Sequence, residues 1–346
     1  MRASMPLHQW PAADQAMWCA LHRAGGVFDD RGPFALIRDS TIKIRRNAYG
    51  RWLEWLRRTD PSLLHRAPEA RATLETFKAF AKSHSHLAAS SQAMFATGVI
   101  AVLQAARPEV DWAGHLRVTK GLARKASQTP SSRKQGRVLC SRTLLDAGIR
   151  HAQPEAGSRL TPLQQAVRQR DGTMIAFLAL IPIRHRAFTG LVIGQSLLVS
   201  GHRLTIALPE DLTKSGTPWE ADVPEPLAGL LHAYLGTSRA FLLTRSGQCH
   251  DTLWVNNNGT PMSYPTVGRK VPEITERLTG VRIPPHFFRD AAATTLARTS
   301  TQAARVIAPV LGHNDHRTAE RHYIQAGSIE AGRDYAELLR RVRARR

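Results

Sequence analysis

One stretch of the sequence, between two acidic residues, constrains the fold more than any other. From Asp111 to Asp146 no acidic residue intervenes, and the stretch contains eight arginines and lysines with Ser, Thr and Pro among them. Charges of one sign repel each other and are costly to bury, so such a stretch stays in solvent. The turn-forming residues around Pro130 favour an extended backbone. We therefore predict a basic, solvated linker over residues 117–145 that separates two folded modules.

The module before the linker has the periodicity of helices. Apolar residues recur at helical spacing in three segments, which begin near Ser40, near Leu74 and near Ser90. These segments predict a small all-α domain over residues 36–116. Residues 1–35 contain scattered Trp, Pro and Gly, so we predict an irregular or partly helical N-terminal arm there.

The module after the linker, residues 146–346, is also mainly helical in pattern. Helical periodicity resumes near Thr161 and leads into an apolar run that ends at Ile183. Two short segments, 202–208 and 219–223, alternate between apolar and polar residues as strands do. We therefore predict a mostly α fold with a small antiparallel β-sheet, that is, an α+β domain that follows an N-terminal all-α domain.

The charge balance narrows the class of partner. The chain has 48 Lys and Arg against 27 Asp and Glu, a formal net charge of +21. A field of that sign attracts polyanions and indicates a nucleic acid partner.

The three cysteines are far apart in the sequence, which argues against a disulfide framework and a zinc site. No run of eighteen apolar residues and no signal-peptide pattern occurs, so we expect no membrane association and a cytoplasmic location.

The last quarter of the chain carries three motif blocks in a fixed order. They are His286-Phe287-Phe288-Arg289, then Leu311-Gly312-His313, then Tyr323. Cleavage of a phosphodiester without a metal needs a nucleophile, cations on the non-bridging oxygens and a proton donor for the leaving oxygen. Arginine grips two oxygens and stays charged, and histidine exchanges protons near neutral pH. Because Pro284-Pro285 favour a helix start, we expect His286 and Arg289 to share the first turn of one helix.

These blocks resemble the C-terminal signature of the tyrosine recombinase, or phage integrase, family. In that signature H-x-x-R and L-G-H precede a nucleophilic tyrosine, which here is Tyr323, ten positions after His313. The resemblance implies that Arg289 is the second transition-state arginine and His286 a hydrogen-bond or proton-transfer partner. It also implies that His313 contacts the scissile phosphate. Tyr335 is the rival nucleophile, but it lacks the family's spacing.

The resemblance also assigns a first arginine and a lysine. The first arginine is Arg184, with Arg186 as an alternative. Two departures from the family pattern lie beside it, since Pro182 replaces the usual glycine and Ala187 the usual glutamate. Lys214, between the two predicted strands, corresponds to the lysine that protonates the leaving 5′ hydroxyl.

The family resemblance implies a site-specific DNA recombinase that clamps duplex DNA between its two domains. It cuts and rejoins strands through a 3′-phosphotyrosine intermediate, needs no cofactor or metal, and acts as a homo-oligomer, a tetramer on paired sites. The predicted DNA-binding residues of the linker are Arg117, Lys120, Arg124, Lys125, Arg133, Lys134 and Arg137. Two alternatives stay open. One is a monomeric type IB topoisomerase-like enzyme that swivels strands, and the other is a catalytically silent DNA-binding accessory protein.

Overall fold

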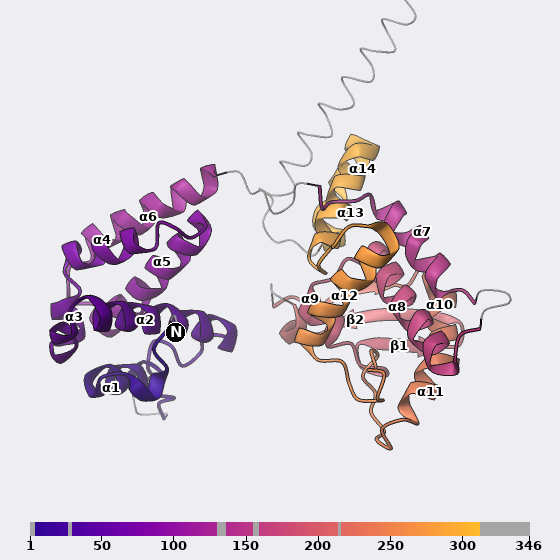
Figure 1. Cartoon of the computed structure of the whole chain (residues 1–346), viewed down its shortest axis with the longest axis horizontal. Coiled ribbons are helices and arrows are strands. Elements are labelled where there is room, and N and C mark those ends of the chain that lie inside the picture. Colours follow the sequence, from indigo (N-terminus) through magenta and orange to yellow (C-terminus); the bar gives the residue numbers. More distant parts are fainter. Residues whose placement is uncertain (1–3, 27–29, 130–135, 155–158, 214–215, 312–346) are drawn as a thin grey trace, which may run out of the picture. The chain divides into compact units, whose positions relative to one another are not determined.

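The chain divides into two units, Met1–Ser131 and Ser132–Arg346, in a computed structural model (Figure 1). The structure describes residues 4–26, 30–129, 136–154, 159–213 and 216–311. Each unit has its own hydrophobic core.

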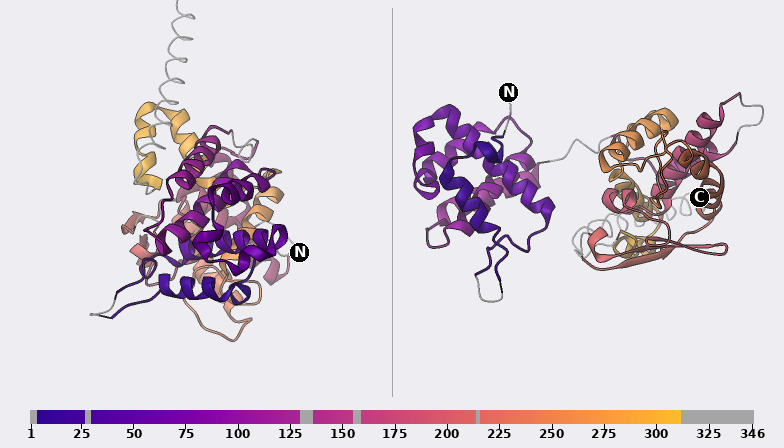
Figure 2. Two further views of the ribbon diagram at one scale, coloured as in Figure 1. Left: turned by 90° about the vertical axis from the view of Figure 1, so that its left-hand side faces the viewer. Right: turned by 90° about the horizontal axis from the view of Figure 1, so that it is seen from below.

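The first unit is built of helices and connecting loops in every view (Figures 1 and 2). Its short 3₁₀ helices are η1 (Leu7–Gln9) and η2 (Pro61–His65). Its α-helices are α1 (Ala12–Leu21), α2 (Asp39–Thr59), α3 (Pro68–Arg71), α4 (Leu74–Ser83), α5 (Ala89–Ala106) and α6 (Ala113–Gln128). The three helices predicted from periodicity correspond to α2, α4 and α5.

The N-terminal segment is part of the core of the first unit and is not a separate arm. Trp10 and Trp18 are buried and pack edge to face, with ring centroids 5.4 Å apart. Phe34 is also buried against Trp18. The expectation of a separate arm over residues 1–35 was therefore wrong, because the segment packs into the core. The expectation that it is partly helical agrees with α1. Large aromatic side chains gain too much from burial to remain in solvent.

The first half of the predicted linker is a helix. Residues 117–128 lie in α6, so the extended conformation expected for them was wrong. Arg, Lys, Leu and Ala are good helix formers, and the helix ends at Gln128, two residues before Pro130. One face of α6 is buried, where His115 Nε2 lies 2.9 Å from the carbonyl oxygen of Ala72. The predicted solvent exposure of the charges nevertheless holds on the opposite face.

One helix among the described residues, α5, is long and apolar enough to cross a membrane by length and composition alone. Phe95, Val99 and Leu103 of this helix are buried in the core of the first unit. Packing in that core accounts for its apolar character.

The second unit combines helices with one small sheet (Figure 1). Its elements up to the sheet are α7 (Ser141–Ala152), α8 (Pro162–Leu180), α9 (His185–Thr189), β1 (Leu197–Ser200), β2 (Arg203–Leu208), η4 (Glu210–Leu212) and β3 (Trp219–Asp222). Beyond the sheet lie α10 (Leu227–Ala233), the π-helix η5 (Tyr234–Arg239), α11 (Ala240–Leu243), α12 (Tyr264–Thr279), α13 (Phe287–Thr299), α14 (Thr301–Arg305) and α15 (Ile307–Leu311).

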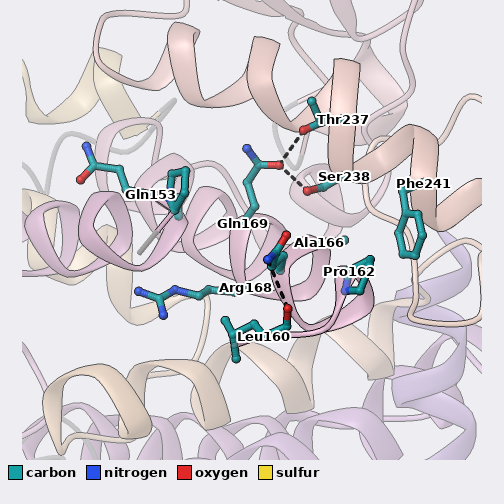
Figure 3. A pocket seen from close by; sticks show the side chains of 12 residues that line it. Gln153, Leu160, Pro162, Ala166, Arg168, Gln169, Thr237, Ser238 and Phe241 are labelled. Atoms are coloured by element: carbon teal, nitrogen blue, oxygen red, sulfur yellow. Dashed lines mark hydrogen bonds between the residues drawn. The ribbon is translucent and has the colours of Figure 1, made fainter. Parts of the chain in front are cut away.

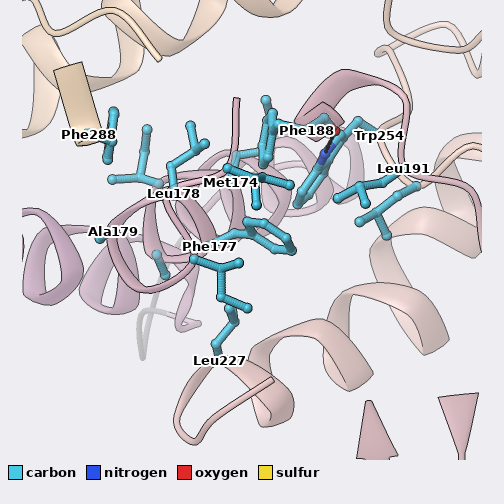
Figure 4. Close-up of a cluster of buried hydrophobic side chains, with 14 of the residues drawn as sticks. Met174, Phe177, Leu178, Ala179, Phe188, Leu191, Leu227, Trp254 and Phe288 are labelled. Carbon is cyan, nitrogen blue, oxygen red and sulfur yellow. Dashed lines mark hydrogen bonds between the residues drawn. The ribbon is translucent and has the colours of Figure 1, made fainter. Parts of the chain in front are cut away.

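The helix α8 forms the centre of the second core. Thr161 and Gln164 form a capping box at its start, which satisfies backbone donors of the first turn. Phe177 packs against Phe188 and Trp254, and the indole of Trp254 donates a hydrogen bond of 2.9 Å to the Phe188 carbonyl (Figure 4). Burial of side chains of this size contributes about 1.5–3 kcal/mol each. The apolar run predicted from the sequence is thus the buried second half of a helix, followed by a short extended segment.

The sheet has three antiparallel strands in the order β1-β2-β3. Leu197 pairs with Ile206 across the first hairpin, and Leu208 pairs with Trp219 across the second. Gly201, with φ of +59°, permits the tight turn between β1 and β2. The alternating segments predicted strands β2 and β3, and Lys214 falls in the connection between them. The edge strand β1 was not predicted.

Candidate active site

Two arginines from distant parts of the chain line one cavity of about 450 Å³ in the second unit. They are Arg184, which caps the start of α9, and Arg289, in the first turn of α13. The cavity also contains Thr213, next to Lys214 in the sequence, and Leu311, two residues before His313. Its remaining lining residues are Ile183, Ala187, Leu208, Leu212, Thr217, Pro218, Trp219, Glu220, Ala308, Pro309 and Val310.

Arg184 reaches the cavity because of the way α8 ends. Pro182 prevents the helix from continuing, and the backbone is extended at Arg184 before α9 begins. The flanking residues Ile183 and Phe188 are buried, which fixes the direction of the half-buried arginine between them. Burial lowers the pKa of Arg184 below its usual value. Arg186, the alternative first arginine, is exposed and does not line the cavity.

Arg289 is held in place by two backbone carbonyls. Its Nη1 donates to the Pro182 oxygen at 2.9 Å, and its Nη2 donates to the Leu311 oxygen at 2.6 Å. These bonds connect the segment that carries Arg184 to the segment that leads to His313. The proline that replaces the family's glycine therefore still offers a carbonyl to the second arginine.

The two guanidinium groups are close enough to influence each other. Burial, and then the positive charge of Arg184, lower the pKa of Arg289 to about 10, while Asp290 acts in the opposite direction. Two like charges in a partly desolvated site are unfavourable until an anion neutralises them. The cavity is therefore suited to a phosphate group, which both guanidinium groups can grip through paired oxygens.

The helix α15 reaches the cavity because α13 carries small residues where the two helices meet. Ala292, Ala293 and Ala297 are buried and form a cluster with Ile307 and Leu311. The indole nitrogen of a further residue, Trp219, donates to the carbonyl of Pro309 at 3.3 Å, which joins β3 to α15. The sheet and the C-terminal helices thus both line the cavity and are joined to each other.

His286 lies beside this cavity and does not line it. It precedes α13, which begins at Phe287, and its side chain is exposed while that of Arg289 is half-buried. His286 is the residue just before the first turn of α13, and Arg289 is the third residue of that helix. That the two side chains act on one phosphate stays a prediction. The charge of His286 also lowers the pKa of His185, although burial is the larger cause.

Three predicted site residues, Lys214, His313 and Tyr323, lie outside the described residues. Thr213 directly precedes Lys214 in the sequence, and Leu311 is two residues before His313. Both Thr213 and Leu311 line the cavity. Of the predicted DNA-binding residues, Arg133 and Lys134 also lie outside it.

The other predicted DNA-binding residues fall into two groups. Arg117, Lys120, Arg124 and Lys125 are exposed on α6, and the first three project from one face because they are three and four residues apart. Arg137 belongs to the second unit, where its guanidinium donates to the carbonyl of Arg282.

Residue patterns did not reveal the polar contacts that build the site. The carbonyls of Pro182 and Leu311 hold Arg289, yet any residue offers a carbonyl, so no side-chain pattern points to them. Thr217 and Glu220 also line the cavity. The sequence pointed to Thr217 and Glu220 only through their position, since Thr217 lies between the two predicted strands and Glu220 lies on the second.

A second pocket, of about 430 Å³, lies between α8 and the π-helix η5 (Figure 3). Gln169 projects into it and accepts hydrogen bonds from Thr237, at 3.0 Å, and from Ser238. None of the predicted site residues that the structure describes is among its lining residues. The arginine-lined cavity is therefore the candidate active site.

The second unit contains a segment that matches a known protein family. Residues 160–328 match the model of the phage integrase family, a segment that contains both arginines and all three motif blocks. A search of curated protein sequences gives no match.

Solved structures with a similar fold include the XerH site-specific recombinase bound to its difH substrate. It is 13% identical, with 85% of this chain and 78% of that chain covered and a TM-score of 0.53. The Tn1549 transposon integrase in complex with transposon right end DNA is 14% identical, with 86% and 94% covered and a TM-score of 0.55. The same integrase with a circular intermediate DNA gives 14% identity, 87% and 96% coverage and a TM-score of 0.53. The part of the chain that matches the phage integrase family is thus residues 160–328, and the motif blocks and the paired arginines all lie within it.

Proposed function

We propose that this protein is a site-specific DNA recombinase that cuts and rejoins DNA through a 3′-phosphotyrosine intermediate. The observation that carries the proposal is the pair Arg184 and Arg289 in one cavity, with the Arg289 guanidinium hydrogen-bonded to the carbonyl just before Gly312-His313. Such a cavity neutralises the charge that develops on a phosphodiester under attack. The DNA complexes of the similar XerH and Tn1549 proteins support the same substrate class.

In this proposal the oxygen of Tyr323 attacks phosphorus and the bond to the 5′ oxygen breaks. His286 accepts the phenol proton, and Lys214 donates a proton to the leaving 5′ oxygen. Arg184, Arg289 and His313 hold the non-bridging oxygens. The 5′ hydroxyl of a partner strand then reverses the attack, so the bond energy is kept in the phosphotyrosine and no cofactor is needed.

We further propose that the exposed basic face of α6 contacts the DNA backbone. Arg117, Lys120 and Arg124 project on one side of the helix, opposite the buried His115. Phosphate contacts of this kind give affinity without sequence preference and weaken as salt rises.

The active form would be a tetramer on two paired sites in the cytoplasm, where its DNA lies.

The test is covalent trapping on a nicked suicide substrate that carries the recognition site. The wild-type protein should form an adduct that resists boiling in detergent, in EDTA and without ATP. Tyr323→Phe removes one oxygen and almost no volume, so it should keep DNA affinity and form no adduct. Tyr335→Phe is the matched control and should behave as wild type. An adduct with Tyr323→Phe would disprove the assignment of the nucleophile.

Two further readouts separate the alternatives. Arg289→Ala should slow adduct formation by about 100-fold or more, since removal of one transition-state donor costs roughly 3 kcal/mol. Four-way junctions formed from two marked duplexes indicate a recombinase, whereas relaxation of supercoils without junctions indicates a topoisomerase. No adduct from the wild-type protein on its cognate site would favour the silent accessory protein.

A further inference from the structure

Arg137, at the end of the predicted linker, uses its guanidinium within the second unit. Its Nε and Nη2 donate to the carbonyl oxygen of Arg282 at 3.1 and 2.8 Å. The central carbon of the guanidinium lies 5.2 Å from the centre of the Phe287 ring. A planar guanidinium gives two N–H donors to one carbonyl while its centre lies over the ring, a fork geometry that a lysine ammonium does not reproduce.

One of these contacts lies within the connection between α12 and α13, and the other lies on Phe287, the first residue of α13. Within the connection, the amide of Ile283 donates to Thr275 Oγ1 at 2.9 Å, which fixes the backbone beside the Arg282 carbonyl. At the start of α13, Phe287 is 3% exposed, and its ring centroid lies 4.5 Å from that of His286 at an angle of 80°. Arg137 therefore contacts the aromatic ring against which the histidine packs.

The residues that follow Arg137 hold this arrangement along α13. We call residues 137–141 the strap. Val138 and Leu139 pack against the core of the second unit, and the amide of Ser141 donates to Thr295 Oγ1 at 3.0 Å. The strap is thus attached near the start of α13 and again two turns later.

We propose that Arg137 is a positioning residue for His286, which it holds through the Phe287 ring and the Arg282 carbonyl, and is not a phosphate contact. This inference rests on the proposed function, because it needs His286 to act on the scissile phosphate. A histidine at a helix start can adopt several rotamers, and a packed ring beside it limits that choice. Misplacement of a catalytic group by about 1 Å can slow a reaction by roughly 100-fold.

The test compares DNA affinity with the rate of adduct formation in the full-length protein. Arg137→Ala should leave the dissociation constant and its salt dependence near the wild-type values. At saturating substrate it should slow adduct formation by about tenfold or more, because the Phe287 ring beside the histidine loses this contact. Arg137→Lys keeps the charge and the stem but should also be slow. Arg142→Ala removes a side chain that is 87% exposed and should match wild type.

A double-mutant cycle identifies the contact. If Arg137 acts through the ring, Phe287→Leu should slow adduct formation, and adding Arg137→Ala should slow it little further. A wild-type rate for Arg137→Ala would overturn the proposal. If affinity and salt slope fall at the same time, Arg137 is a phosphate contact.

Thermal unfolding shows whether each variant is folded. If Arg137→Ala unfolds, the test passes to Arg137→Lys, and a wild-type rate there would overturn the proposal. Adduct formation by the wild-type protein tests the proposed function separately, so failure of one does not imply failure of the other.

Discussion

Asp14 and Arg71, both fully buried, form an ion pair inside the first unit. The hydroxyl of Tyr49, also buried, donates to the same carboxylate at 2.7 Å. Burial and the negative charge of Asp14 raise the pKa of this tyrosine well above its usual value, so it remains a neutral donor. The network joins α1 to α2 and α3, and it explains how the N-terminal segment became part of the core.

Asp14→Ala should destabilise the first unit strongly, because it leaves the charge of Arg71 buried without its partner. Loss of one partner of a buried pair costs about 3–5 kcal/mol. Urea unfolding followed by tryptophan fluorescence measures this, since five of the seven tryptophans lie in the first unit.

The matched control is Asp146→Ala. Asp146 faces Arg142 at 4.0 Å in a solvent-exposed pair, so its loss should cost no more than about 1 kcal/mol. Equal effects of the two substitutions would show that the buried network contributes little to stability.

At the scale of elements, α7 and α8 approach each other through two glycines. A Cβ atom on Gly172 would lie 2.4 Å from the amide nitrogen of Ala152, and one on Gly148 would lie 2.6 Å from that of Ala176. Both obstacles are backbone atoms, which cannot rotate away. The glycines therefore set the distance between α7 and the helix whose end leads to Arg184.

Gly172→Ala should force the two helices apart and destabilise the second unit by about 1–3 kcal/mol or more. Gly121→Ala is the control, because a Cβ on Gly121 of α6 meets no atom within 4 Å. Alanine is a better helix former, so the control should gain about 0.5–1 kcal/mol. Urea unfolding gives both values, and a stable Gly172→Ala protein would contradict the close packing.

The sequence predicts those elements whose pattern reflects their burial. Helix α2 is amphipathic and β2 alternates buried with more exposed residues, so both could be predicted. Strand β1 has one buried residue followed by three exposed ones, so it does not alternate. The buried face of α1 includes the charged Asp14 beside Met17, Trp18 and Leu21, so its apolar pattern is incomplete. The charges of α6 were correctly placed in solvent, but charge alone does not distinguish a helix from an extended segment.

In the candidate site too, the sequence predicts some residues and leaves others undecided. The motif spacing identified Arg289, and the resemblance left Arg184 and Arg186 as alternatives. Packing separates these two, since Arg184 is half-buried beside the cavity and Arg186 is exposed. The sequence could not predict which linker cations face solvent, because the partners of Arg137 lie about 145 residues away in the chain.

For the whole molecule, the boundary between the units determines which fragment keeps the site intact. The second unit begins at Ser132, so a fragment of residues 132–346 retains the strap and all of α7. A fragment of residues 145–346 lacks the strap and also Leu144, which is fully buried in the core. We expect the longer fragment to unfold at the same temperature as the second unit in the full chain. The shorter fragment should unfold several degrees lower, because it has lost part of its core. For a protein of this size, a loss of about 1 kcal/mol in the free energy of unfolding lowers the midpoint of thermal unfolding by roughly 2–4 °C.

The longer fragment should also show how much the first unit contributes to DNA binding. It lacks α6, and with it the four exposed cations Arg117, Lys120, Arg124 and Lys125. If these neutralise phosphates, the logarithmic salt slope of binding should become shallower by about 0.9 for each phosphate that is no longer neutralised, up to roughly 3.6 for all four cations. Titration of a cognate duplex at several salt concentrations gives the slope for the fragment and for the full chain. An unchanged slope and affinity would show that the first unit does not contact DNA. Loss of four cations that bind phosphates would reduce the number of counterions released, and so would change the slope.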